Sequence, residues 1–223
     1  MLAKGKRGML QVARSVLLAL CVSGVLIATD PLGADILSHS TYVQQLERAR
    51  ADYFAGIDGD SNATDRAERD FASLEHARPN DATVMVYSGS LQLIEAARTW
   101  AVWNKHKLAT EGLSKLDRSR QLDPQNLEVR FIHGETSWHL PFFYHRKQDA
   151  ERDFAFIAPR AESAARIGAL KPELAAAALD RYGRILADEN DTTGARNAYE
   201  AAVRIDRGGP AGKDASRRLN ELS

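Results

Sequence analysis

The feature that most constrains this chain is a helical spacing of apolar residues that returns in separate segments. Two stripes follow the same spacing of four, three and four residues, which places each stripe on one face of an α-helix. They consist of Tyr42, Leu46, Ala49 and Tyr53, and of Leu127, Phe131, Gly134 and Trp138. No segment shows a sustained alternation of Val, Ile and Thr, so β-strands find almost no support. The sequence therefore predicts an all-α fold.

Breaks between the stripes divide the chain into pairs of helices. Asn62 or Thr64 is expected to cap the helix that carries Phe71, and Asp81 the next long helix. No strong breaker follows Trp100, but we expect a hairpin there rather than one helix of roughly 40 residues, which is uncommon in a compact domain. The predicted helix-pair units are about 41–79, 81–124, 127–159 and 173–209, followed by a capping helix at 211–222.

The second helix of the 81–124 unit is predicted to begin at about Lys105. In the 127–159 unit, Pro141 ends the first helix and the partner helix begins at about Arg146, because proline cannot continue a helix. A short helix is expected from Ala161 to Leu170. The glycine in the second stripe allows close approach of a neighbouring helix.

Length and charge bound the class of protein. The 223 residues are enough for one domain or at most two. Lys and Arg number 30, as do Asp and Glu, so the chain has no formal net charge. The chain therefore lacks the excess positive charge typical of nucleic-acid-binding proteins, and we expect no nucleic-acid partner.

Residues 1–34 differ in composition from residues 35–223, which form the predicted helical domain. Basic residues precede an uncharged apolar run, an order that fits either a cleaved export signal or an N-terminal membrane anchor formed by residues 12–29. The sequence thus predicts an exported, periplasmic protein, or one held at the inner membrane. Contact with the membrane is expected only through this segment, if it is not removed. Cys21, the single cysteine, lies within it.

The segment Ala176 to Gly209, 34 residues long, resembles a tetratricopeptide repeat. The residues at the places typical of that family are Leu179, Tyr182, Gly183, Leu186, Ala195, Tyr199 and Ala202, whereas Arg207 replaces the usual terminal proline. Gly112 with Leu116 and Ala67 with Phe71 take comparable places in earlier units. The resemblance implies antiparallel helix pairs stacked as a right-handed solenoid, whose inner groove often binds peptides or protein segments.

From this resemblance and the composition of residues 1–34 we expect a non-catalytic scaffold or adaptor of the bacterial cell envelope, with a protein or peptide partner. The expected peptide-binding residues, which face the groove in the family-like frame, are Asn104, Glu135, Trp138, His139, Asp180 and Arg184. No catalytic residue, cofactor or metal ligand is predicted. A purely structural envelope protein is an open alternative.

A histidine-based metal-dependent hydrolase is the second alternative. Its candidate residues lie within one short segment, at His133, Glu135, His139 and His145. The spacing argues against a metal site, because His133 and His139 are six residues apart and lie roughly 120° apart around a helix. Glu135 and His139 are four residues apart and are expected to pair.

Aromatic residues are expected mainly in the core. Trp100, Trp103 and Trp138 could line a ligand groove, but large aromatics at helical spacing more often pack in the core, and packing is what we expect. The Phe142–Tyr144 loop is expected to fold back onto Phe154 and Phe156. If these loop aromatics were exposed, they would mark a partner site.

Overall fold

The structure is a computed structural model that describes the backbone of residues 31–222 and the side chains of residues 39–222. The chain divides into two compact units, Met1–Ser38 and His39–Ser223. Most of the expected signal or anchor, residues 1–34, lies outside the described residues. In the part that the structure covers, no helix is both long and apolar enough to cross a membrane. All regular structure in residues 31–222 is helical, which confirms the predicted all-α class.

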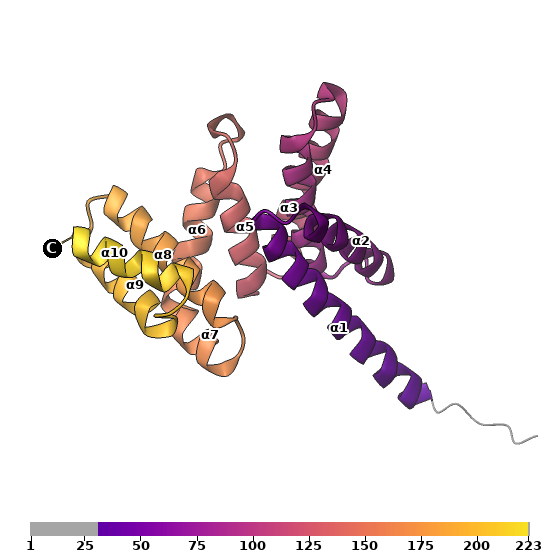
Figure 1. The fold of residues 1–223 in the computed structure, drawn as a ribbon, viewed down its shortest axis with the longest axis horizontal. Coiled ribbons are helices and arrows are strands. Elements are labelled where there is room, and N and C mark those ends of the chain that lie inside the picture. The colour runs from indigo at the N-terminus through magenta and orange to yellow at the C-terminus, as the bar shows by residue number, and fades with distance from the viewer. Residues whose placement is uncertain (1–30, 223) are drawn as a thin grey trace, which may run out of the picture. The chain divides into compact units, whose positions relative to one another are not determined.

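The helices follow one another with short connections (Figure 1). Two of them are 3₁₀-helices, η1 and η2, and the rest are α-helices. Their bounds are α1 Pro31–Ile57, α2 Ser61–Ala77, α3 Ala82–Arg98, α4 Val102–Leu122, α5 Leu127–His139, η1 Phe142–Tyr144, α6 Lys147–Ile157, η2 Ala158–Arg160, α7 Ala161–Ile167, α8 Pro172–Asp188, α9 Thr192–Ile205 and α10 Pro210–Glu221.

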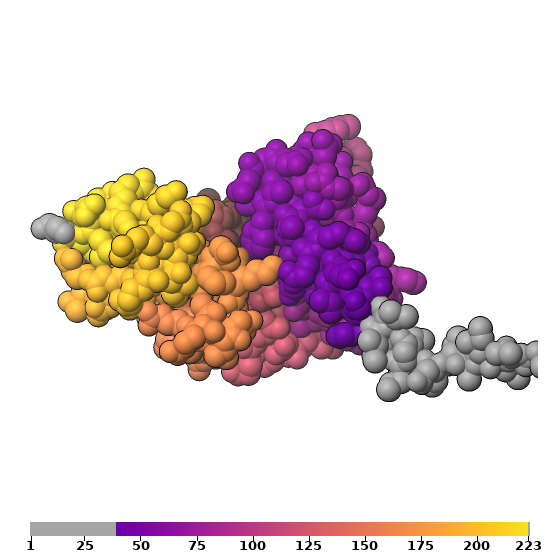
Figure 2. Space-filling view, turned by 60° about the horizontal axis from the view of Figure 1, so that its bottom comes forward, coloured from indigo at the N-terminus to yellow at the C-terminus, as the bar shows by residue number. Residues whose placement is uncertain are grey.

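Neighbouring helices pack as pairs within the unit His39–Ser223. Helices α3 and α4, α5 and α6, and α8 and α9 make the most extensive contacts, and α10 covers α8 and α9. Between the pairs, α3 lies against α5 and α6 lies against α8. In the space-filling view, the helices coloured indigo to purple and those coloured yellow occupy opposite ends of this unit (Figure 2).

Side-chain caps begin several helices where the sequence places short polar residues. Asp81 accepts hydrogen bonds from the backbone N–H groups of Thr83 and Val84, at 2.9 and 3.1 Å, which confirms the predicted cap of α3. The predicted cap of α2 was wrong: Asp60 takes that role by accepting from the N–H of Ala63 at 3.1 Å. Asn62 and Thr64 lie inside the helix, since the chain turns into it two residues earlier.

The α3–α4 hairpin confirms that a turn follows the first long helix. Helix α4 begins at Val102, three residues before the predicted start at Lys105. The helices approach closely, because a Cβ atom added to Gly112 would lie 2.8 Å from Cγ of Leu93 and 2.9 Å from the carbonyl oxygen of Gly89. The small residue at 112 is thus a packing requirement of the pair.

The first stripe is buried as predicted and leads into an aromatic core. Tyr87 of α3 is fully buried and stacks on Phe71 of α2, with ring centroids 4.9 Å apart. Tyr53 of α1 meets the Tyr87 ring edge-on at 4.8 Å. The Tyr87 hydroxyl donates to Glu128 of α5 at 2.8 Å, and Arg50 of α1 donates to both oxygens of the same carboxylate at 2.6 Å. This junction fixes α1, α2, α3 and α5 together.

Two expectations about aromatic residues were wrong. Trp100 and Trp103 are 87% and 71% exposed, because they lie at the α3–α4 turn, beyond the contact between the helices. Phe142 and Phe143 are 89% and 58% exposed instead of packing inward. Pro141 ends α5 in an extended conformation, and the chain passes outward through η1 before it returns to α6.

The two phenylalanines that were expected to receive the loop aromatics pack against other residues. Phe154, which was expected to receive them, is fully buried and packs edge-on against Phe131 of α5, with ring centroids 6.4 Å apart. Phe156 is covered by the guanidinium groups of Arg130 and Arg160, at 3.8 and 4.0 Å from the ring centroid. Of the three loop aromatics only Tyr144, which is partly buried, packs against the core.

Candidate functional site

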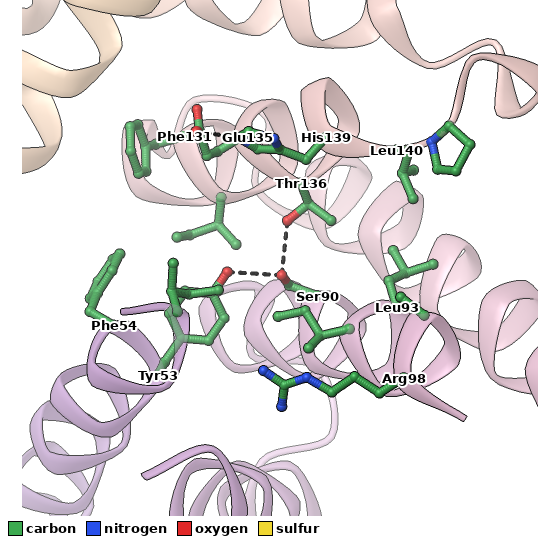
Figure 3. Close-up of a pocket in the computed structure, with 15 residues that line it drawn as sticks. Tyr53, Phe54, Ser90, Leu93, Arg98, Phe131, Glu135, Thr136, His139 and Leu140 are labelled. Atoms are coloured by element: carbon green, nitrogen blue, oxygen red, sulfur yellow. Dashed lines mark hydrogen bonds and ion pairs between the residues drawn. The ribbon is translucent and has the colours of Figure 1, made fainter. Parts of the chain in front are cut away.

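An open groove of about 560 Å³ lies between α1, α3 and α5 (Figure 3). These are the first helices of three successive pairs, and each contributes one face. Most of the lining is apolar, and residues from all three helices form it: Tyr53, Phe54, Ile57, Ser90, Leu93, Ile94, Ala97, Arg98, Phe131, Ile132, Glu135, Thr136, His139 and Leu140, with Pro141 directly after α5. Concave, mainly apolar sites of this size are typical of ligand binding.

A chain of hydroxyl groups crosses the groove and joins its three helices. Tyr53 of α1 and Ser90 of α3 share a hydrogen bond of 2.8 Å, and Thr136 of α5 donates to Ser90 at 2.9 Å (Figure 3). Burial raises the pKa of Tyr53 to about 12, so its hydroxyl remains neutral at physiological pH. Since these polar groups already satisfy one another, they fix the spacing of the helices.

A hydrogen-bonded pair, Glu135 and His139, lies on the α5 side of the groove. Nε2 of His139 lies 3.0 Å from Glu135, which confirms the predicted pairing, and both residues line the groove (Figure 3). Arg181 of α8 donates to the same carboxylate at 2.5 and 3.2 Å. Burial opposes the charge of Glu135, but the bonds with His139 and Arg181 outweigh it and lower the pKa of the carboxyl group. At the α3 side, Arg98 is exposed.

The six expected binding residues fall into three places. Glu135 and His139 line the groove, and Trp138 stands beside them, with the Arg181 guanidinium 5.0 Å from its ring centroid. Asp180 and Arg184 form a separate ion pair on α8, 3.7 Å apart, and Arg218 of α10 also lies 3.4 Å from Asp180. Asn104 is exposed in the first turn of α4 and is not among the residues that line the groove.

Several groove residues were not found from the sequence. Tyr53 was predicted only as a member of a packing stripe, and Ser90 and Thr136 carry no local pattern that distinguishes them. Arg181, which does not itself line the groove, is also missing from the expected site residues, although it reaches α5 and donates to Glu135. Its position in the same helix as two expected site residues was the available signal, but the helix face that meets α5 is decided by packing.

His133 lies in the core rather than at the groove. It is 1% exposed, and its Nδ1 is 2.5 Å from the carboxylate of Asp153, which is fully buried in α6. Its Nε2 faces Asp117 of α4 at 3.6 Å, and Arg130 donates to Asp153 at 2.9 Å. Arg146 donates to both oxygens of Asp117, at 2.7 and 2.8 Å. These groups form one ion-paired network between α4, α5 and α6.

The network sets the charge of His133. Burial disfavours the imidazolium, but the carboxylates of Asp117 and Asp153 outweigh this and raise the pKa of His133. The neighbouring imidazolium of His133, together with Arg146, lowers the pKa of Asp117 well below its ordinary value despite partial burial. Because His133 is enclosed, a substrate does not reach it in this conformation. Among the residues whose side chains are described, no group of three or more His, Cys, Asp or Glu residues could hold a metal ion.

Comparison with known proteins adds no relative. No protein-family model, no curated protein and no solved structure shows significant similarity to this chain. The resemblance to tetratricopeptide repeats thus depends on the residues themselves, and functional inference depends on the geometry of the groove.

Proposed function

We propose that this protein is a non-catalytic binding module that holds a short segment of a protein partner in the groove between α1, α3 and α5. The observation that carries the proposal is the open apolar groove of about 560 Å³, built by the first helices of three successive pairs. Its apolar lining favours a partner that buries apolar side chains, because the hydroxyl groups of the floor already bond to one another.

The proposed fold is a stack of tetratricopeptide-like repeats, and three features support it. Consecutive helices pack as pairs, first helices meet across pairs, and Gly183 lies against Tyr199 at the family-like places of the last pair. In such a stack, the first helices line the inner groove, where segments of partners bind. The proposed location in the bacterial cell envelope depends on the order of basic and apolar residues in 1–34.

The partner segment we propose is an amphipathic helix with an acidic residue at one end. Apolar residues at helical spacing would contact Phe54, Leu93 and Phe131, which come from the three walls. A carboxylate on this helix would meet Arg98, the exposed cation of the α3 wall. Glu135 is already paired with Arg181 and His139, so it offers little to a basic partner residue.

A peptide library tests this proposal. Peptides selected on the wild-type protein should bind the Ala97→Arg variant about tenfold or more weakly, because a charged side chain would fill an apolar groove. Ala97 is an exposed groove residue, so the substitution leaves the core intact. Affinities are measured by fluorescence anisotropy of labelled peptides.

The matched control is Ala51→Arg, the same substitution at an exposed helical position that does not line the groove. This variant should bind the selected peptides as the wild type does. Equal affinity of the wild type and Ala97→Arg for every selected peptide would reject the groove as the binding site. Circular dichroism of both variants confirms that helical content is kept.

A further inference from the structure

Two turns of the unit His39–Ser223 expose large apolar side chains. The α3–α4 turn carries Trp100, Val102 and Trp103, which are 87%, 75% and 71% exposed. The α5–α6 turn carries Phe142 and Phe143, which are 89% and 58% exposed. Such exposure of neighbouring aromatic residues is costly in water and is typical of an interaction surface.

The structure holds these side chains outward in a defined arrangement. The Trp100 and Trp103 rings meet edge-on at 6.3 Å, and the Phe142 and Phe143 rings meet edge-on at 5.8 Å. Beneath the second turn, Arg146 bonds to both oxygens of Asp117, and His145 adopts a left-handed conformation with φ of 53°. The Phe142–Phe143 pair is therefore presented by an anchored turn.

Basic residues accompany the aromatic residues at both turns. No Asp or Glu lies between Ala96 and Thr110 or between Thr136 and Gln148, although the whole chain is neutral. The first segment contains the basic residues Arg98, Lys105 and Lys107, and the second contains Arg146 and Lys147; each segment also includes histidine. Three of these cations have acidic neighbours: Lys107 lies 3.9 Å from Glu111, Lys147 lies 3.9 Å from Glu151, and Arg146 is paired with Asp117. All three tryptophans of the chain, at 100, 103 and 138, fall in these two segments.

The equivalent turns of the outer helix pairs have the opposite character. The α1–α2 turn includes Asp58 and Asp60, and the α8–α9 turn includes Glu189 and Asp191, with no aromatic residue in either connection. Of these four turns within helix pairs, only the two central ones carry aromatic residues in the connection. In Figure 1 both central turns lie at the upper ends of their helix pairs, on the same side of the unit.

We propose that the α3–α4 and α5–α6 turns together dock on the surface of an anionic phospholipid membrane. Tryptophan and other aromatic rings are favourable at the boundary between headgroups and acyl chains, and nearby lysines attract anionic headgroups. Two turns on one side can contact a flat surface at the same time. Exposed aromatic and basic residues on turns are suited to contact with a bilayer. A protein segment, by contrast, would bind in the concave groove. The inference does not depend on the proposed function of the groove.

The tryptophans supply a direct test in the full chain. The Trp138→Phe variant retains indoles only at 100 and 103, so its fluorescence reports the α3–α4 turn and not the N-terminal segment. This variant is reconstituted into vesicles that contain brominated lipids, which quench indoles located in the membrane interface. We expect strong quenching with phosphatidylglycerol present and little quenching in vesicles of phosphatidylcholine alone.

Substitutions in each turn then test the contributions of the basic and of the aromatic residues to membrane binding. Lys105→Gln and Lys107→Gln should each weaken the docked state about fivefold, since a basic residue near an anionic surface contributes on the order of that factor. Phe142→Ser combined with Phe143→Ser should reduce quenching of the indoles in the other turn, because the turns dock together. Ile167→Ser, at a 76% exposed apolar position outside both turns, is the control and should have no effect.

Three results would overturn the proposal. Indoles that stay accessible to aqueous iodide and are not quenched by brominated lipid would show that the turns do not touch the membrane. Equal quenching in neutral vesicles would reject recognition of anionic lipid. Concentration-dependent protection from iodide without any lipid would show instead that a second copy of the chain covers the aromatic residues.

Discussion

The α5–α6 and α8–α9 pairs use the same helix hairpin but are stabilised by different chemistry. In α5–α6, a buried imidazole and carboxylate, His133 and Asp153, meet at 2.5 Å inside the interface. In α8–α9, the interface is built from buried alanines and from Gly183 packed on the Tyr199 ring. One pair depends on paired charges and the other on close apolar contact.

This difference determines how each pair responds to substitution. Buried charges are stable only while every partner is present, because an isolated charge in the core keeps its desolvation cost without compensation. Apolar interfaces of small residues depend on shape, and an added methyl group is tolerated only where a neighbour can move. The two pairs should therefore fail under different mutations.

The largest effect is expected when the charged interface loses its central anion. Asp153→Ala would leave the side chains of His133 and Arg130 without their carboxylate partner. We expect a loss of about 3–5 kcal/mol in the free energy of unfolding. The control, Asp149→Ala, removes a carboxylate that is 18% exposed and pairs with Arg146 and Arg152, and it should cost less, on the order of 1 kcal/mol. Urea denaturation measures both, and equal losses would contradict a structural role for the buried network.

A smaller effect is expected from overpacking the apolar interface. A Cβ atom at Gly183 would lie 2.5 Å from Cε1 of Tyr199, so the ring must shift. Gly183→Ala should cost about 1–3 kcal/mol of stability from overpacking, partly offset by the roughly 1 kcal/mol by which alanine favours a helix.

The matched substitution at Gly134, in the charged pair, has more space. Its added Cβ would lie 3.2 Å from Cβ of Asp153, so a shift of a few tenths of an ångström relieves the contact. Gly134→Ala should therefore lie within about 1 kcal/mol of the wild type, because helix propensity opposes the remaining strain. A greater loss at Gly134 than at Gly183 in urea denaturation would reverse this comparison.

The smallest expected effect is a pH dependence that only the charged pair shows. The raised pKa of His133 means that its stabilising contribution is fully present below its ordinary pKa of 6.5. This contribution is lost as the pH rises through the raised pKa of the folded state. The stability advantage of the wild type over His133→Gln should hence shrink with rising pH. An advantage in urea denaturation that is constant from mildly acidic to alkaline pH would argue against a charged His133.

The sequence predicted those features that depend on local spacing. Proline positions, the Asp81 cap and the four-three-four stripes identified most helix boundaries to within a few residues, since they act within one helix. The close approach at Gly134 also followed, because a glycine in an apolar stripe leaves space for a neighbouring helix. The groove lies on the face of α5 that carries Glu135 and His139, two of the expected site residues.

Contacts between segments that are distant in the sequence could not be predicted from the spacing of residues within one helix. Asp153 pairs with His133 across 20 residues, and Arg181 reaches Glu135 across 46. The exposed tryptophans were misplaced for a related reason: aromatic residues usually pack inward, but Trp100 lies in a connection too short to fold back over either helix. Only the arrangement of whole helices decides these positions.

The groove and the two aromatic turns share residues where they meet. Arg98 closes one wall of the groove just before Trp100, and Leu140 and Pro141 close another just before Phe142. A segment bound in the groove would consequently sit beside whatever surface the turns touch. A partner attached to the same surface would have a high effective concentration near the groove. Even a groove that binds this partner with low affinity would therefore be mostly occupied.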